Sequence, residues 1–247
     1  MMEEKKRKIG IIGGVGPMAT VVFMKKIIEM TDAVRDQDHI EILVDHCPSI
    51  PDRTAYILDH TKPNPVGKIL ECANRLADGG AYEIAIPCVT AHFFHQEIQE
   101  KSRREVLNGV RDTMDYLKER GYSKIGVMAT DGTVRSNLFV QNESDGMEII
   151  YPSAERQKDV MHLIYDDVKS GREPEMGLFY RVTDELNDKG AEVIVLGCTE
   201  LSVIADHRHP QGLYLDVLDV LARRLVMDCG RLKSQYRELL PLKGEKL

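Results

Sequence analysis

Short apolar runs alternate along this chain with longer segments in which apolar residues recur every three or four positions. The short runs are bounded by glycine, proline or polar residues, which is typical of buried strands. We expect strands over residues 8–12, 39–45, the run ending at Cys88, the run starting at Lys124, 147–151, the run ending at Cys198, and 213–216. The longer segments predict helices over residues 17–31, 65–78, 93–120 with a break near 106–109, a stretch starting near 133, 154–169, 174–189, and a closing stretch to about 240. Strands that alternate with helices predict an α/β fold with parallel sheets.

Two pairs of segments repeat each other at nearly the same offset. The run from Gly80 to Cys88 superposes without a gap on the run from Gly190 to Cys198, a shift of 110 positions, and residues 124–132 repeat residues 8–16 with a shift of 116. Such recurrence indicates a duplicated unit. We therefore expect two similar doubly wound parallel-sheet domains related by a pseudo-twofold, formed by residues 1–107 plus 213–247 and by residues 108–212, with the active site in the cleft between them.

The composition narrows the class of function. The chain has 43% hydrophobic and 30% charged residues and a formal net charge of −7, which favours a soluble globular protein and disfavours a nucleic-acid partner. No apolar stretch approaches the roughly 20 residues that cross a membrane. Five cysteines without a CxxC spacing predict reduced thiols in a cytoplasmic protein and give no support to a zinc site.

The glycine-rich turn from Gly14 to Ala19 fits the GxGxxA form of a dinucleotide fingerprint, but we do not expect a nicotinamide or flavin cofactor. Asp45 ends the next predicted strand about 30 residues past the glycines, where roughly 20 is usual. A glycine turn before a helix can also serve other anions, because free N–H groups and the helix dipole point at the same place. We expect a protein that works without a cofactor or metal.

Cys88 and Cys198 are the candidate reactive groups. Each follows a strand at its carboxyl end, where open α/β sheets bind their ligands, and the two occupy equivalent places in the repeat. One thiolate can remove a proton from carbon while a thiol on the opposite face supplies one, which inverts a stereocentre. For Cys47, Cys72 and Cys229 we predict a structural role, because an unpaired cysteine usually behaves as a small buried hydrophobe.

Five motifs resemble the aspartate/glutamate racemase family, the cofactor-independent amino-acid racemases. The resemblance runs from about Lys8 to the last predicted helix. The motifs, in chain order, are Gly13-Gly14-Val15-Gly16-Pro17-Met18-Ala19-Thr20, Ile50-Pro51-Asp52-Arg53-Thr54, Pro87-Cys88-Val89-Thr90-Ala91-His92, Ala129-Thr130-Asp131-Gly132-Thr133 and Gly197-Cys198-Thr199-Glu200-Leu201.

The resemblance implies roles for particular residues. Cys88 and Cys198 would be the acid/base pair, and Arg53, in a long loop over residues 46–64, would grip the side-chain carboxylate of aspartate or, second, glutamate. Lys169 matches a lysine of the family's second domain. The further substrate-binding residues would be Met18, Thr90, Thr130, Thr133 and Thr199, and the supporting residues Asp52, Val89, His92 and Glu200. The resemblance also implies a homodimer.

One departure keeps other functions open. The family usually has asparagine directly after the first cysteine, and Val89 offers only methyl groups where that amide could bind an amino acid. A different isomerase or a decarboxylase could use one thiol as nucleophile or proton donor on this scaffold. A ligand-binding protein that has lost turnover is the third hypothesis.

Overall fold

The computed structural model describes residues 7–142 and 146–245, and within them the strands form two parallel four-stranded sheets. In the first sheet β1 (Ile9–Gly13), β2 (Ile42–His46), β3 (Glu83–Ala85) and β4 (Glu105–Val106) lie in the order β2-β1-β3-β4. In the second sheet β5 (Lys124–Ala129), β6 (Glu148–Ile150), β7 (Val193–Gly197) and β8 (Tyr214–Asp216) lie in the order β6-β5-β7-β8. The two orders are the same, so the expected α/β fold with two similar halves is confirmed.

Equivalent residues of the two sheets make equivalent contacts. Gly10 on β1 pairs with Ile84, and Gly126 on β5 pairs with Ile194. These pairs are the ones that the repeat makes equivalent, since Ile194 lies 110 positions after Ile84 and Gly126 lies 116 positions after Gly10. A Cβ atom on Gly10 would lie 3.1 Å from the Ala81 side chain, and one on Gly126 would lie 3.0 Å from the side chain of the matching alanine, Ala191. The duplication seen in the sequence is therefore kept in the packing of the central strands.

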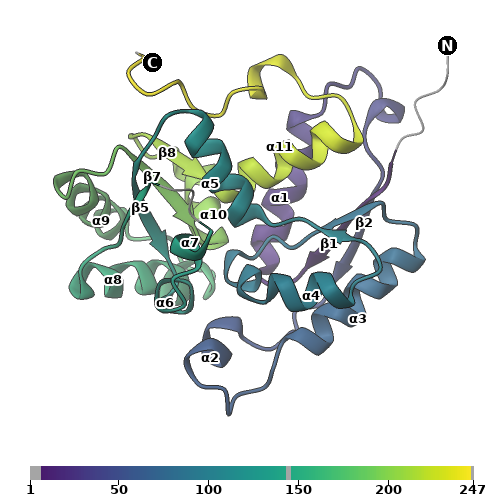
Figure 1. The fold of residues 1–247 in the computed structure, drawn as a ribbon, viewed down its shortest axis with the longest axis horizontal. Coiled ribbons are helices and arrows are strands. Elements are labelled where there is room, and N and C mark those ends of the chain that lie inside the picture. Colours follow the sequence, from purple (N-terminus) through teal and green to yellow (C-terminus); the bar gives the residue numbers. More distant parts are fainter. Residues whose placement is uncertain (1–6, 143–145, 246–247) are drawn as a thin grey trace.

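Helices cover the faces of both sheets, and α1 and α11 cross the middle of the molecule side by side (Figure 1). The α-helices are α1 (Pro17–Met30), α2 (Arg53–Leu58), α3 (Val66–Asp78), α4 (His95–Lys101), α5 (Gly109–Glu119), α6 (Asp131–Arg135), α7 (Leu138–Gln141), α8 (Ala154–Met161), α9 (Met176–Asp188), α10 (Thr199–Arg208) and α11 (Val217–Cys229). The other helical segments are the 3₁₀ helices η1 (Asp36–Asp38), η2 (Val89–Phe94) and η4 (Ser234–Tyr236) and the π-helix η3 (His162–Val168). Within the described residues, no helix combines the length and apolar character needed to cross a membrane.

Three predicted elements differ from the structure. Residues 46–64, expected to be one long loop, contain α2. This helix begins after Asp52, because the Asp52 carboxylate accepts a hydrogen bond from the Ala55 amide at 2.7 Å. The short strand β4 (Glu105–Val106) lies at the start of the break that we expected near residues 106–109. The last helix ends at Cys229 and not near 240, because Gly230 packs directly against Ile40 and the chain then turns back.

The C-terminal segment contributes to both halves. β8 pairs with β7 in the second sheet, although we expected the first unit to resume at residue 213. The helix that follows, α11, packs against α1 and joins the core of the first sheet, where Leu221 and Leu225 lie in one cluster with Ile9, Ile11 and Phe23. α11 therefore lies between the two halves, because Val217 and Val220 belong to the core cluster of the second sheet.

Candidate active site

Cys88 and Cys198 line one small cavity between the carboxyl ends of the two sheets. Cys88 comes shortly after β3 and directly before η2, and Cys198 lies directly between β7 and α10, so both stand in extended backbone just ahead of a helical turn. The side chains that line the cavity come from both halves: Val15, Asp52, Arg53, Thr54, Cys88, Val89, Thr90, Thr130, Tyr165, Lys169, Cys198, Thr199 and Glu200. The cavity has a volume of about 10 Å³, which is room for roughly one water molecule.

The Cys198 thiol is held as a neutral donor. Its Sγ donates a hydrogen bond to Glu200 Oε2 at 3.1 Å, and both residues are buried. Burial, and then the negative charge of Glu200, raise the pKa of Cys198 well above its usual value, although Lys169 acts in the opposite direction. A thiol in this state is suited to giving a proton rather than taking one.

Arg53 is buried, with 8% of its surface exposed. Its side chain bonds to backbone carbonyls of its own loop and also lines the cavity. Nη1 donates to the backbone carbonyls of Ile50 at 3.3 Å and Pro51 at 3.0 Å, and Nη2 donates to that of Val15 at 3.3 Å. Burial lowers the pKa of Arg53, but the nearby Cys88 sulfur and the carboxylates of Asp52 and Glu200 together outweigh burial, and the pKa is raised. Nε is buried and has no hydrogen-bond partner among the described residues. Arg53 thus keeps a free donor beside Cys88.

Lys169 supplies a second cation from the opposite half. Its ammonium lies 3.9 Å from the centre of the Tyr165 ring, and the Tyr165 hydroxyl donates to Asp52 Oδ2 at 3.3 Å across the cavity. Tyr165 lies in the π-helix η3, a distortion that is frequent at functional sites, and Lys169 follows it. Burial lowers the pKa of Lys169, but Glu200 and Cys198 raise it more. Lys169 therefore stays charged near the second thiol.

Four threonine hydroxyls form a buried cluster beside the cavity. Thr90 bonds to Thr130 at 3.0 Å and to Thr133 at 3.1 Å, and Thr54 donates to Thr130 at 3.2 Å. Three of these residues were predicted from the motifs. Thr54 was missed, although it directly follows Arg53, because a hydroxyl residue in a loop carries no signal of its own. The cluster joins α2 and η2 of the first half to α6 of the second.

Several predicted site residues lie elsewhere or play another part. Met18 points outward on α1 with 52% of its surface exposed and does not line the cavity. His92 lies behind the cavity, where Nδ1 donates to the carbonyls of Cys88 at 3.1 Å and Val89 at 3.2 Å, and burial lowers its pKa to about 4. His92 is therefore neutral and holds the turn that carries Cys88. Val89 does line the cavity and is buried with the apolar core of the second half.

The glycine-rich turn is shaped by close packing. Gly14 has a φ of +85° and lies against the backbone of Cys47 and Pro48, and its N–H donates to Thr20 Oγ1 at 3.0 Å. A Cβ atom on Gly16 would lie 2.5 Å from Glu200 Oε1. Asp45, which lies near the end of the strand after these glycines, is bound by Arg75 at 2.7 Å. These glycines let the first turn approach the loop of Arg53 and the carboxylate of Glu200. Among residues 7–142 and 146–245, no cluster of His, Cys, Asp and Glu side chains could hold a metal ion.

Comparison with known proteins gives consistent results for most of the chain. A family model described as Asp/Glu/Hydantoin racemase matches residues 12–225. The broad specificity amino-acid racemase RacX of Bacillus subtilis (strain 168) is 26% identical over 223 residues, which cover 88% of this chain and 96% of RacX.

Solved structures show the same likeness. The aspartate racemase of Picrophilus torridus has a TM-score of 0.82 and 30% identity, covering 94% of this chain and 98% of its own. Glutamate racemase from Francisella tularensis subsp. tularensis SCHU S4, solved in complex with D-glutamate, has a TM-score of 0.62 and 16% identity, covering 95% and 84%, and at that identity it shares the fold alone. On the match over residues 12–225, the chain belongs to the Asp/Glu/Hydantoin racemase family.

Proposed function

We propose that this chain is a cofactor-independent racemase of an acidic amino acid, aspartate first and glutamate second, and that it works with two cysteines. The observation that carries the proposal is that Cys88 and Cys198, from equivalent strand ends of a duplicated fold, line one cavity. A substrate Cα held between two thiols can lose a proton to one sulfur and gain a proton from the other. The likeness to an aspartate racemase at 30% identity supports the substrate class.

The two cations that line the cavity, Arg53 and Lys169, are suited to binding an anionic substrate. The protein has a net charge of −7, and a buried carboxylate is strongly unfavourable unless a cation and hydrogen bonds accompany it. Arg53 offers its free Nε and a planar fork that fits a carboxylate, and Lys169 offers a compact charge on the other side of the cavity. We assign the side-chain carboxylate of the substrate to Arg53. Lys169 then faces the rest of the amino acid.

The surroundings of the two sulfurs suggest different resting roles. Arg53, from the same half as Cys88, lines the cavity with it. Cys198 faces Glu200 and is held as a neutral thiol. In the resting protein Cys88 would take the proton and Cys198 would give one; after one turnover the two states are exchanged, and the other enantiomer is processed in the reverse direction.

The cavity in this structure is too small for an amino acid, so substrate entry requires its walls to separate. Room for one water molecule contrasts with the several carbon, nitrogen and oxygen atoms of aspartate. The walls include Arg53 and Thr90 from the first half and Thr130 and Lys169 from the second. The halves, or the loop that carries Arg53, would open and close in each turnover. From the family resemblance we further propose a homodimer, and from the cysteine usage a reducing, cytoplasmic setting.

The exchange of the α-proton with solvent tests the proposal. In deuterium oxide, L-aspartate should gain deuterium at Cα and D-aspartate should appear with the label, with no added cofactor. Cys88→Ser and Cys198→Ser should each lower the rate of racemisation by about 100-fold or more, since each removes a general acid/base group. Full racemisation by either variant would refute the two-thiol mechanism. Tight binding of aspartate without any exchange would favour the ligand-binding hypothesis.

A further inference from the structure

A second, larger cavity lies at the amino end of the first sheet, opposite the end that carries Cys88. It has a volume of about 890 Å³, within the range of 300–1,000 Å³ that is usual for small-molecule sites. Its walls come chiefly from the start of β1, the residues just before β3 and β4, and the end of α11. It shares no lining residue with the cysteine cavity, so we call it the amino-end cavity.

The strand register aligns three of its polar side chains in one row. The first residues of β1, β3 and β4 are paired with one another, and Lys8, Tyr82 and Arg104 directly precede them. The Tyr82 N–H donates to the Lys8 carbonyl at 2.7 Å, which keeps this row in register. Neighbouring strands are about 4.8 Å apart, so the backbones of the two cations lie about 10 Å apart, with the tyrosine between them.

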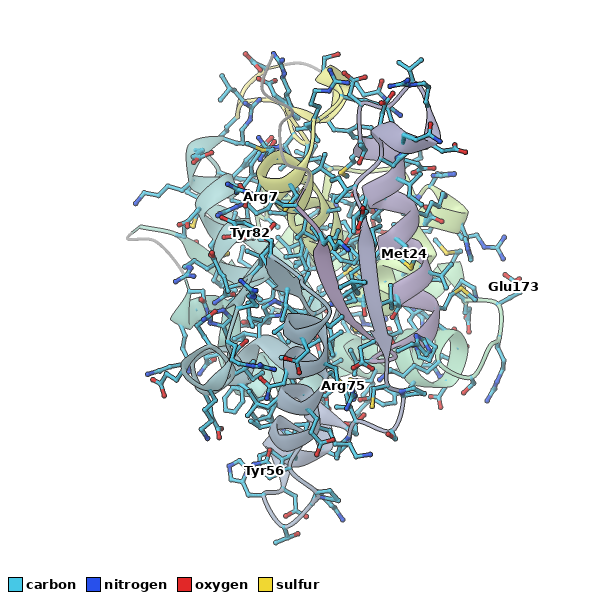
Figure 2. All side chains as sticks on the ribbon, turned by 90° about the vertical axis from the view of Figure 1, so that its right-hand side faces the viewer. Arg7, Met24, Tyr56, Arg75, Tyr82 and Glu173 are labelled. Atoms are coloured by element: carbon cyan, nitrogen blue, oxygen red, sulfur yellow. The ribbon has the colours of Figure 1, made fainter. Side chains whose placement is uncertain are left out.

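Tyr82 and Arg7 form an exposed flat surface in this cavity. The guanidinium carbon of Arg7 lies 4.1 Å from the centre of the Tyr82 ring, and Figure 2 shows the two residues close together at the start of the first sheet. Tyr82 keeps 43% of its surface exposed, and Met227, which lines the same cavity, keeps 51%. Aromatic rings and guanidinium planes are surfaces on which a nucleobase can stack.

The carboxylates of the amino-end cavity are already bound by cations from outside it. Asp38 accepts from Arg35 at 3.0 Å, and Asp228 is bound by Arg224. Their charge is therefore largely balanced before any ligand arrives.

Three arginines of the lining keep their charge for a ligand. Arg7 reaches only a backbone carbonyl, that of Asp228, at 3.4 Å. Among residues 7–142 and 146–245, no carboxylate forms an ion pair with Arg7, Arg104 or Arg231, whereas the neighbouring Arg103 binds Asp78 at 2.8 Å. In a chain with a net charge of −7, this cavity thus gathers positive charge. An anionic ligand would be favoured here.

We propose that the amino-end cavity binds a nucleoside triphosphate. The base stacks on the Arg7–Tyr82 pair, and the phosphates bind Arg104 and Arg231, whose planar forks fit phosphate oxygens. A single small anion would leave the exposed ring uncovered and could not contact cations on separate strands. A ligand with a flat ring and several anionic groups meets both features. This inference does not depend on the activity proposed above.

Calorimetric titration of the full chain with ATP, in buffer without magnesium, tests the proposal. We expect saturable binding of one ATP per chain, and binding of adenosine or of tripolyphosphate that is about tenfold weaker or more. Arg104→Ala and Arg231→Ala should each weaken ATP binding by about tenfold or more, because each removes charge-assisted hydrogen bonds. Tyr82→Ala should weaken the binding of ATP and leave that of tripolyphosphate unchanged, because only ATP carries a base to stack.

Arg172→Ala is the matched control, since it removes an exposed arginine of the second half that lies outside the amino-end cavity. It should bind ATP as wild type does, and an equal loss in this variant would mean that ATP responds only to overall charge. No saturable binding at millimolar ATP would overturn the proposal. So would full affinity in both Arg104→Ala and Arg231→Ala, or tripolyphosphate that binds as tightly as ATP, because the site would then lie elsewhere or recognise no base.

Discussion

Replacement of Arg53 by leucine separates two roles that the structure gives to one side chain. The guanidinium donates to three backbone carbonyls, of which the Nη1 bond to Pro51 at 3.0 Å is the shortest, and it leaves Nε free beside Cys88. Hydrogen bonds from a charged donor contribute about 1.5–3 kcal/mol each when well formed. Since two of the three are long, we expect Arg53→Leu to lower the free energy of unfolding by about 3 kcal/mol.

The loss of activity should be larger for a dicarboxylate than for a neutral amino acid. Removing one partner of a buried charge pair costs about 3–5 kcal/mol, so kcat/KM for aspartate should fall by about 100-fold or more. Alanine has no side-chain carboxylate and should lose only what loop disorder costs, about tenfold. Arg53→Lys should recover part of the activity with aspartate, because a point charge cannot reproduce the planar fork.

The assay is racemisation of aspartate and of alanine by wild type, Arg53→Leu and Arg53→Lys, followed by circular dichroism, with urea unfolding of the same samples. The ratio of the two kcat/KM values is the decisive quantity, because loss of folded protein cancels in it. An unchanged ratio would mean that Arg53 only holds its loop. The assignment of the substrate carboxylate to Arg53 would then be refuted.

Two further predictions concern buried carboxylates. After burial, the negative charge of Glu200 is the main cause of the raised Cys198 pKa, and Glu200→Gln removes that charge. The alkaline decline of kcat/KM should therefore begin at lower pH in Glu200→Gln than in wild type or in Glu200→Asp. An unmoved pH profile would contradict the contact between Cys198 and Glu200. Burial raises the pKa of Glu83 from 4.5 to about 7, so the folded state keeps a proton that the unfolded chain releases, and stability should fall as pH rises from about 4.5 to 7. The loss of unfolding free energy due to Glu83 is about 3 kcal/mol. Urea titrations at several pH values should show that Glu83→Gln removes this pH dependence. Equal pH dependence in both proteins would mean that another group is responsible.

The fold could be predicted where the chain repeats itself or carries long periodic segments. The offset between Cys88 and Cys198 predicted two equivalent strands, and both sheets have the same strand order. The misses were short elements. β4 has two residues and α2 has six, and neither is long enough to show a period against its flanking sequence. β4 forms through a tertiary contact, its pairing with β3, whereas α2 begins at a local cap that Asp52 provides.

The site could be predicted as a set of positions but not as a set of directions. Motifs indicated that Arg53, Lys169 and the threonines belong near the cysteines, and the cavity collects most of them. They could not indicate that Met18 points to solvent or that His92 turns its ring toward the backbone of its own turn. Side-chain direction depends on the neighbours that each helix meets, and those are set by parts of the chain far away in sequence.

The passage of the chain from β8 back to α11 has a consequence for synthesis on the ribosome. The apolar cluster that contains Ile9, Ile11 and Phe23 also contains Leu221 and Leu225, which are translated about 200 residues later. A nascent chain therefore exposes this apolar surface until α11 leaves the exit tunnel, long after the second sheet has received its first strands. Chains that stop before residue 217 would keep that surface open, and in the cell they would be targets for chaperones and proteases.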